Sequence, residues 1–239
     1  MSESKRLIAK GVAALPEVGK AMEGGVVVVA TGTTNAYVLE ELWDERIDKR
    51  RYRSGITTPE TPERMEVPVG ERIPDVVFRE GEVASELDRY NAVMGMGKGD
   101  VYIKGANALD YAGGVAGVLI GSSTGGTVGA VLGSIIGKKI HLIIPVGLEK
   151  LVYSDINELH WIASQEDSQG PSLWPLTGTI ITEIEALGIL TGVEVYLYAA
   201  GGVAGAEGAV RLLVEGSEAE VSAALELIES IKGEPRYLL

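Results

Sequence analysis

The chain has 239 residues, of which 46% are hydrophobic and 5% aromatic, and its formal net charge at pH 7 is −13. This acidic balance argues against nucleic-acid binding, which needs clustered Lys and Arg side chains to contact phosphates. The absence of cysteine excludes disulfides, thiolate metal sites and a cysteine nucleophile.

The composition also indicates a class of fold and a location. A core with few aromatic residues and ample Val, Leu, Ile and Ala is typical of a parallel sheet covered by helices on both faces. The first residues, MSESKRLIAKG, lack the apolar segment of a signal peptide, so we expect a cytoplasmic protein. Many Glu and few Asn or Gln residues indicate a thermophilic source.

The N-terminal part predicts the strand–turn–helix unit of an open α/β sheet. Apolar residues at helical spacing predict a helix over residues 4–19. The run VVVVA at residues 26–30 indicates a buried strand, TGTT at 31–34 a tight turn, and residues 35–43 a helix.

Prolines interrupt this pattern over residues 48–79. Ser85 is then predicted to cap a helix in which Asp88 occupies the third position. The predicted elements of this middle part are, in chain order, strands at 65–69 and 75–83, a helix over 85–93, and buried strands at 100–103 and 140–146.

The last part of the chain predicts a smaller α+β unit. Ser217 and Glu220 have the spacing of a capping box at the start of an amphipathic helix. The predicted elements are helices over 157–163, 182–192 and 217–232, a loop over 165–177, and strands at 193–200, 209–215 and 235–239. Their order resembles half or more of a ferredoxin-like unit. We therefore expect a Rossmann-like α/β domain over residues 1–176, with a mostly parallel sheet and helices on both faces, and a ferredoxin-like α+β unit over 177–239.

Glycine recurs at every fourth position from residue 113 to residue 137, in a stretch without charge. So much glycine indicates a close approach of the backbone to a ligand, another helix or a lipid-embedded partner. The stretch is long enough to cross a bilayer. However, its polar centre at residues 122–126 favours a loop between a strand end or turn at 117–121 and a helix over 127–138. We therefore expect no membrane span.

Three groups of residues are candidates for ligand binding. The turn of Thr31, Gly32, Thr33 and Thr34 precedes a helix, where N–H groups and hydroxyls can hold an anion, although Thr can also simply cap the helix. A segment with Lys104, Gly105, Asn107 and Asp110 follows a strand, at the sheet edge where ligands bind in open α/β sheets, although it can also be a plain turn. The third group comprises Ser123, Thr124, Gly125, Gly126 and Thr127, which form either an anion cradle or a close helix–sheet contact.

Glu149 and Lys150 follow another predicted strand end and add a carboxylate and an ammonium group. The two histidines, His141 and His160, are nineteen positions apart, and no spacing of His, Asp and Glu resembles a metal site. We therefore expect no metal and no cofactor.

Taken together, these segments resemble the superfamily that contains ribose-5-phosphate isomerase, glucosamine-6-phosphate deaminase, the coenzyme A transferases and the initiation-factor-2B-like proteins. The resemblance covers residues 24–150 and rests on VVVVATGTTNAYVLEEL, KGANALD, and IGSSTGGT followed by GKKIHLIIPVG. It implies that the TGTT loop holds a substrate phosphate. Lys104 and Asn107 stand where the isomerases carry two catalytic carboxylates, and Asp110 is retained. No glutamate matches the one that coenzyme A transferases acylate.

The leading hypothesis is a protein that binds a phosphorylated, sugar-phosphate-like small molecule. In an isomerase-type enzyme, Asp110 or Glu149 would act as base, and Lys104 or Lys150 would stabilise an enediolate. The loss of two carboxylates favours the alternative of a non-catalytic ligand sensor or regulatory subunit. A coenzyme A ester-binding protein and a glycine-mediated assembly protein are further alternatives, and we expect a homo-oligomer in each case.

Overall fold

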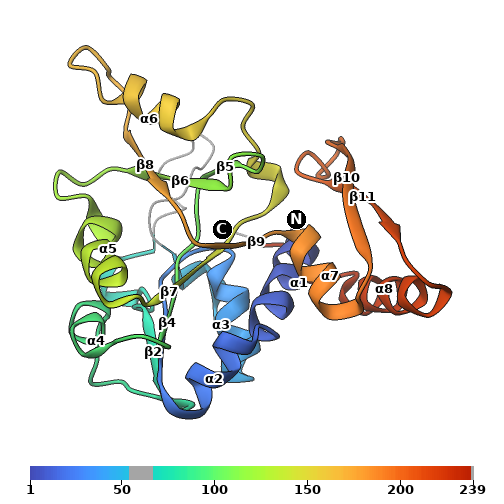
Figure 1. The fold of residues 1–239 in the computed structure, drawn as a ribbon, viewed down its shortest axis with the longest axis horizontal. Coiled ribbons are helices and arrows are strands. Elements are labelled where there is room, and N and C mark those ends of the chain that lie inside the picture. The colour runs from blue at the N-terminus through green and yellow to red at the C-terminus, as the bar shows by residue number, and fades with distance from the viewer. Residues whose placement is uncertain (54–66, 238–239) are drawn as a thin grey trace.

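The computed structural model describes residues 1–53 and 67–237, which form a mixed α/β fold (Figure 1). These residues contain eight α-helices and a mostly parallel central sheet. The predicted strand at 65–69 lies partly outside the described residues, and a short 3-10 helix, Val69–Glu71, occupies its end.

The central sheet has six strands in the order β3-β2-β1-β4-β7-β9. Strands β1, β4, β7 and β9 are parallel to one another, whereas β2 pairs antiparallel with β1 and forms an antiparallel hairpin with β3. The strands are β1 (Val26–Val29), β2 (Val76–Arg79), β3 (Glu82–Val83), β4 (Val101–Ile103), β7 (His141–Pro145) and β9 (Thr179–Ile181).

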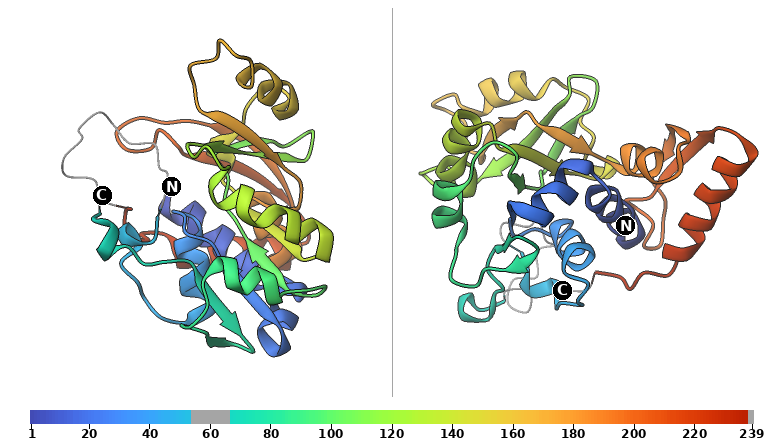
Figure 2. Two further views of the ribbon diagram at one scale, coloured as in Figure 1. Left: turned by 90° about the vertical axis from the view of Figure 1, so that its left-hand side faces the viewer. Right: turned by 60° about the horizontal axis from the view of Figure 1, so that its bottom comes forward.

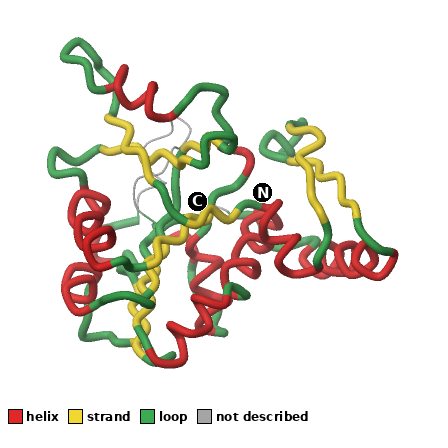
Figure 3. The backbone as a smooth tube through the Cα atoms, in the orientation of Figure 1, coloured by secondary structure: helices red, strands yellow, loops and turns green. Residues whose placement is uncertain are grey.

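Helices cover both faces of this sheet, as the sequence predicts (Figure 3). Side chains alternate between the faces of a strand, so Val27 and Val29 join one core cluster and Val28 joins the other. The first cluster includes residues of α1 (Ser2–Ala13), α3 (Asn35–Trp43) and α7 (Glu183–Thr191), and the second those of α4 (Arg89–Gly95) and α5 (Gly126–Lys138). A strand buried on both faces needs apolar residues throughout, which explains the run VVVV.

Two of the predicted helices begin at different residues in the structure. The helix predicted over 4–19 is two helices, α1 and α2 (Pro16–Gly24), because Pro16 cannot continue a helix but fits the first position of a new one. Helix α4 begins at Arg89 and not after Ser85. Its cap is Asp88, whose carboxylate accepts hydrogen bonds from the N–H groups of Tyr90 and Asn91.

Gly11 brings α1 against α7. A Cβ atom added at Gly11 would lie 2.5 Å from the Cβ of Ala186, which is too close for two carbon atoms. We therefore expect Gly11→Val to reduce the free energy of unfolding by about 1–3 kcal/mol, measured by urea denaturation. Gly19 is the matched control, because it is helical, exposed and open on its Cβ side. Gly19→Ala should stabilise the protein by about 0.5–1 kcal/mol, and equal losses for the two variants would contradict this packing.

A second, three-stranded antiparallel sheet lies beyond the central sheet, at the top of Figure 1. Its strands are β5 (Ala108–Asp110), β6 (Val115–Ile120) and β8 (Ser172–Leu176), and α6 (Ile156–Ala163) packs against β8. The prediction of a loop over 165–177 is therefore wrong at β8. A proline normally argues against a strand, but Pro175 lies in an edge strand of this sheet, where a missing N–H is tolerated.

The C-terminal elements project to one side of the molecule (Figure 2). They comprise α7, the antiparallel pair β10 (Glu194–Ala200) and β11 (Val210–Glu215), and α8 (Glu218–Ile231). The predicted capping box of Ser217 and Glu220 is confirmed. Pro235 to Tyr237 form no strand, and residues 238–239 lie outside the described part. Strand β9 follows the predicted boundary at residue 176 but belongs to the central sheet.

No single neighbour is shared by all the glycines at four-residue intervals, although Gly125 and Gly129 both lie against Trp174. A Cβ at Gly117 would contact Leu173, and one at Gly129 would lie 2.2 Å from the carbonyl oxygen of Thr124, whereas Gly133 and Gly137 have nothing within 4 Å. The spacing therefore does not mark one close-packed stripe. In the described part of the chain, no helix is long and apolar enough to cross a membrane.

Candidate functional site

The carboxyl ends of β1, β4, β7 and β9 lie along one edge of the central sheet, which we call the carboxyl edge. The chain leaves β1 toward β2 on one side and leaves β4 toward β7 on the other. Connections that diverge from adjacent parallel strands open a crevice between the strand ends, where ligands of open α/β sheets bind. In this fold that topological position lies between the turn that contains Thr31 and the segment that begins at Lys104.

Two amides of the turn from β1 to α3 already have acceptors within the protein. The N–H of Thr31 donates to Asp75 Oδ1 at 2.7 Å, and the N–H of Gly32 donates to the carbonyl of Tyr52 at 3.2 Å. Thr34 is 3% exposed, and its hydroxyl has no hydrogen-bond partner within the described residues. In the first turn of α3, the N–H groups of Ala36 and Tyr37 donate to the carbonyls of Gly32 and Thr34 at 2.9 and 3.0 Å, so the Thr34 hydroxyl is the unpartnered group at this helix start.

Asn35 joins the ends of β1 and β4. Its Nδ2 donates to the carbonyl of Ala30 at 2.7 Å and to that of Ile103 at 3.3 Å. Its Oδ1 is buried and unpartnered among the residues described, and it faces Gly105, where an added Cβ would lie 3.6 Å away. A buried polar atom without a partner is uncommon and marks a position that a ligand or water can complete.

Asp75 is a site residue that sequence reasoning missed. It precedes β2, whose antiparallel direction brings its N-terminal end to the carboxyl edge. Arg89 Nε lies 2.7 Å from Asp75 Oδ2, and Arg89 Nη1 donates to Thr127 Oγ1 at 2.5 Å. Burial raises the pKa of Asp75, although Arg89 and Thr31 oppose the rise. The pair thus connects the β1–α3 turn with the starts of α4 and α5.

Lys104 follows β4 and lies partly buried beside this pair. Its Nζ donates to the carbonyl of Gly105 at 3.0 Å. Burial lowers the pKa of Lys104 to about 8, Asp75 opposes this change, and Lys150 and Arg89 add to it.

Lys150 lies in the 3-10 helix η3 (Leu148–Lys150) after β7, the next strand beyond β4. Its Nζ donates to the carbonyl of Ala106 at 2.7 Å. Burial lowers the pKa of Lys150, while Glu149 and Glu183 oppose the change. Glu183, at the end of β9, accepts the N–H of Leu148 at 2.9 Å, and burial raises its pKa. Glu183 was also missed, although its place after a parallel strand could have indicated it.

Lys104 and Lys150 therefore bring two ammonium groups to the carboxyl edge, and nearby carboxylates act on them through charge without an ion-pair contact. Neither ammonium group has a carboxylate within ion-pair distance in residues 1–53 and 67–237; each donates to one main-chain carbonyl. An ammonium group has three donors, so each lysine can give further hydrogen bonds to an anion.

Other predicted site residues form local structure. Asp110 accepts the N–H of Gly113 at 2.8 Å in the β5–β6 turn, and Asn107 accepts that of Leu119 at 3.1 Å across the same hairpin. Glu149 pairs with Lys5 at 3.3 Å. In the glycine-rich loop, the Ser122 and Thr124 hydroxyls bond to each other at 3.0 Å. That loop contains Ser123, Gly125 and Gly126. Thr127, which follows it, contacts the Asp75–Arg89 pair by accepting a hydrogen bond from Arg89.

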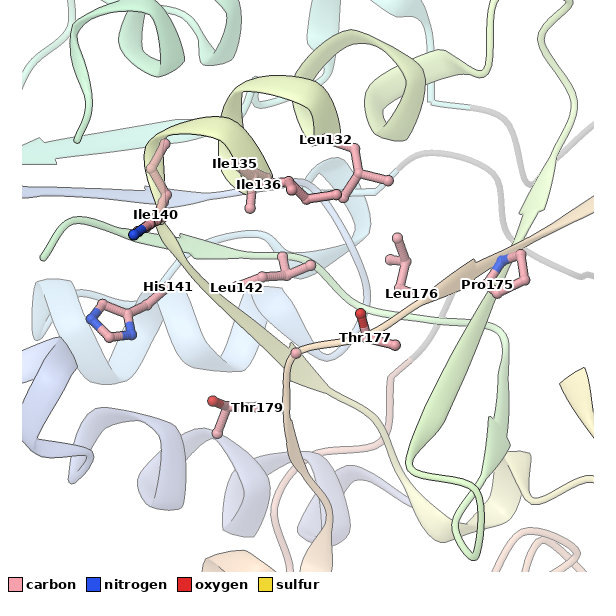
Figure 4. Close-up of a pocket in the computed structure, with 12 residues that line it drawn as sticks. Leu132, Ile135, Ile136, Ile140, His141, Leu142, Pro175, Leu176, Thr177 and Thr179 are labelled. Carbon is pink, nitrogen blue, oxygen red and sulfur yellow. The ribbon is translucent and has the colours of Figure 1, made fainter. Parts of the chain in front are cut away.

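A pocket of about 380 Å³ lies at the opposite, amino edge of the sheet (Figure 4). Its walls come from the end of α5, the start of β7 and the β8–β9 turn, with Ile136, His141 and Thr179 among the lining residues. It contains none of the predicted ligand-binding residues. No group of three or more His, Asp or Glu side chains in the described part could hold a metal ion.

Comparisons of the chain with protein-family models, with curated protein sequences and with solved structures find no match. The function is therefore inferred from the geometry and charge of the carboxyl edge.

Proposed function

We propose that the protein binds a phosphorylated, sugar-phosphate-like small molecule at the carboxyl edge, between the ends of β1, β4 and β7. The observation that carries this proposal is the pair of partly buried lysines, Lys104 and Lys150, without carboxylate partners among the described residues. An isolated buried ammonium group is costly, and an anion between the two lysines would offset that cost. The buried hydroxyl of Thr34, which has no partner among the described residues, is a further donor for the same anion.

The same proposal includes the superfamily to which the fold belongs and the oligomeric state. Diverging connections around β1 and β4 fit a Rossmann-like arrangement, and α7, β10, β11 and α8 fit part of a ferredoxin-like unit. Together with the TGTT turn, they support a relation to the sugar-phosphate isomerase superfamily. The exposed side chains of Tyr198 and Leu213 on the β10–β11 ribbon are compatible with a homo-oligomer.

The affinity for such an anion should depend on pH through Lys104. The protonated ammonium group binds the anion, so binding raises the pKa of Lys104 above its free value of about 8. Affinity should therefore be maximal below about pH 8 and fall at higher pH, by at most about tenfold per pH unit. Calorimetric titration between pH 7 and pH 9.5 measures this change. An affinity that is constant across this range would remove Lys104 from the site.

Gly32→Val tests the loop without disturbing the fold. A Cβ at Gly32 would lie no closer than 3.7 Å to any neighbour, so the substitution causes no internal clash. A branched side chain there would occupy the space that an anion needs at the start of α3. We expect the ligand-induced rise in melting temperature to disappear while the melting temperature of the free protein stays within a few degrees. Gly24→Val is the control, because Gly24 is also open but lies outside the site.

A non-catalytic sensor is the second candidate, and the engagement of Asp75 favours it. Asp75 is the carboxylate that acts on the charge of Lys104. Its Oδ1 accepts the Thr31 N–H and its Oδ2 faces Arg89, so both oxygens already have partners. Asp110 and Glu149 have local partners as well. An isomerase would need one of these groups to accept a substrate proton.

Exchange of substrate protons with solvent separates the two candidates. Ribose 5-phosphate and related sugar phosphates would be incubated with the protein in D₂O and followed by NMR. Incorporation of deuterium at the carbon beside the carbonyl by the wild-type protein, but not by Asp75→Asn, supports the isomerase. Binding without exchange supports the sensor.

A further inference from the structure

The ribbon of β10 and β11, which projects from the body of the molecule, has a free strand edge along β11 (Figure 1). In the part of the chain that the structure describes, β11 pairs with β10 on one side and with no strand on the other. Proteins commonly protect such an edge with lysine, proline or a bulge in the edge strand. Strand β11, with the sequence VRLLVE, contains no lysine or proline, and the extra residue of the ladder, Tyr198, belongs to β10. This edge is therefore a template for pairing with another chain.

The charged side chains of β11 lie on one exposed face. Residues two apart point to the same face of a strand, so Arg211, Leu213 and Glu215 lie together, and all three are exposed. Neither Arg211 nor Glu215 has an ion-pair partner within residues 1–53 and 67–237. Glu215 lies directly opposite Glu194 of β10, and like charges in that position are destabilising. This face therefore has a pair of carboxylates that lacks a cation and a guanidinium group that lacks an anion.

The β11 strand is complementary to a second copy of itself. In an antiparallel pair of two β11 strands related by a two-fold axis at Leu213, this residue lies opposite the partner's Leu213, and Arg211 lies opposite the partner's Glu215. On the other face, Leu212 lies opposite the partner's Val214, and both residues are only partly buried in the single chain. An axis at Leu212 or at Val214 would instead place Leu213 opposite a charged side chain.

We propose that two copies of the protein form a homodimer in which their β11 strands pair antiparallel about Leu213 and join the two ribbons into one four-stranded sheet. The inference rests on the homo-oligomer of the proposed function and names its interface, whereas the ligand site takes no part in it. Tyr196 lies opposite Leu213 within the ribbon, and these side chains are 46% and 53% exposed. The dimer makes them one apolar row of four side chains, and the two Arg–Glu pairs that flank this row fix the register.

Charge reversal tests the interface and its register together. Arg211→Glu places carboxylates opposite one another across the two-fold axis, and Glu215→Arg does the same with guanidinium groups. Each variant alone should therefore dimerise at least about tenfold more weakly than wild type. An equimolar mixture of the two variants should dimerise again, because every reversed residue then faces the opposite charge. Sedimentation velocity at about 1–200 µM protein measures these equilibria. Lys20→Glu, an exposed charge reversal on α2, is the control and should dimerise like wild type.

Three outcomes would overturn this interface. A wild-type chain that stays monomeric would overturn it together with the homo-oligomer. A dimer that neither charge reversal weakens would have its interface elsewhere. Variants that stay monomeric in the mixture would exclude the register at Leu213. Ligand binding is a separate readout: a rise in melting temperature with a sugar phosphate should persist in the monomeric Arg211→Glu variant, and its absence in wild type would contradict the ligand site without affecting the dimer.

Discussion

Arg6→Met should reduce the free energy of unfolding by about 3–5 kcal/mol, the largest effect on stability that we expect for a single substitution. The Arg6 side chain is 4% exposed and donates to three carboxylates, with Nη1 2.8 Å from Glu41 and Nε 3.0 Å from Glu234. Its Nη2 also donates to Glu40, whose side chain is 2% exposed. These contacts join α1, α3 and the segment after α8. Met keeps the apolar stem but leaves buried carboxylates with fewer partners, which urea denaturation at pH 7 would measure.

The pH dependence of the stability loss in Arg6→Met tests whether the ion pairs of Arg6 cause it. Burial raises the pKa of Glu40, but Lys49 and Arg6 outweigh it, so the folded-state pKa lies below the unfolded value of 4.5. A lowered pKa contributes stability above about pH 4.5 that is lost as pH falls. The difference between wild type and Arg6→Met should therefore shrink on acidification. Glu40→Gln in the Arg6→Met background should recover part of the loss, and a difference independent of pH would contradict the ion-pair account.

Lys104→Met should lower the affinity for the phosphorylated ligand by about 10- to 100-fold, the value of one charge-assisted hydrogen bond. The same substitution should stabilise the free protein. The unfolded chain holds a proton on Lys104 up to about pH 10.5, whereas the folded protein releases it at about pH 8. Burial of the charged form thus costs up to about 3 kcal/mol at neutral pH, and Met removes that cost.

Opposite changes in binding and stability separate this account from simple damage to the fold. Calorimetric titration gives the affinity, and thermal unfolding without ligand gives the stability. Lys98→Met, at an exposed position, should change neither quantity. A Lys104→Met variant that lost both stability and affinity would indicate a structural role for this lysine.

Local sequence signals predicted much of the fold. Consecutive valines marked β1, a tight turn followed, and the helix over residues 35–43 forms with the bounds expected. The Ser217 capping box placed the start of α8. Strand β8 was missed because its pairing with β6 is a long-range contact that lets a segment with Pro175 become an edge strand. The helix break at Pro16 was missed because the helical spacing of apolar residues over 4–19 was given more weight than the proline.

The candidate site was less predictable than the fold, because its partners meet through topology. Lys104 and Lys150 could be placed from their positions after parallel strands. Asp75 reaches the same edge only because β2 runs antiparallel to β1, and Arg89 meets it from the start of α4. Asp110 fitted a family pattern but serves a hairpin turn. The sequence motifs therefore indicated which segments lie at the carboxyl edge. Which charged groups meet there depends on whether each strand pairs parallel or antiparallel with its neighbour.

Thermal unfolding with a panel of ligands tests the central claim most directly. The panel would contain inorganic phosphate, sugar phosphates, nucleotides and coenzyme A esters. A ligand at one hundred times its dissociation constant adds about 2.7 kcal/mol, which should raise the melting temperature of a chain this size by roughly 5–10 °C. We predict such a rise with at least one phosphorylated sugar in wild type and none in Gly32→Val. No rise with any compound, or an equal rise in Gly32→Val, would contradict a phosphate site at the carboxyl edge.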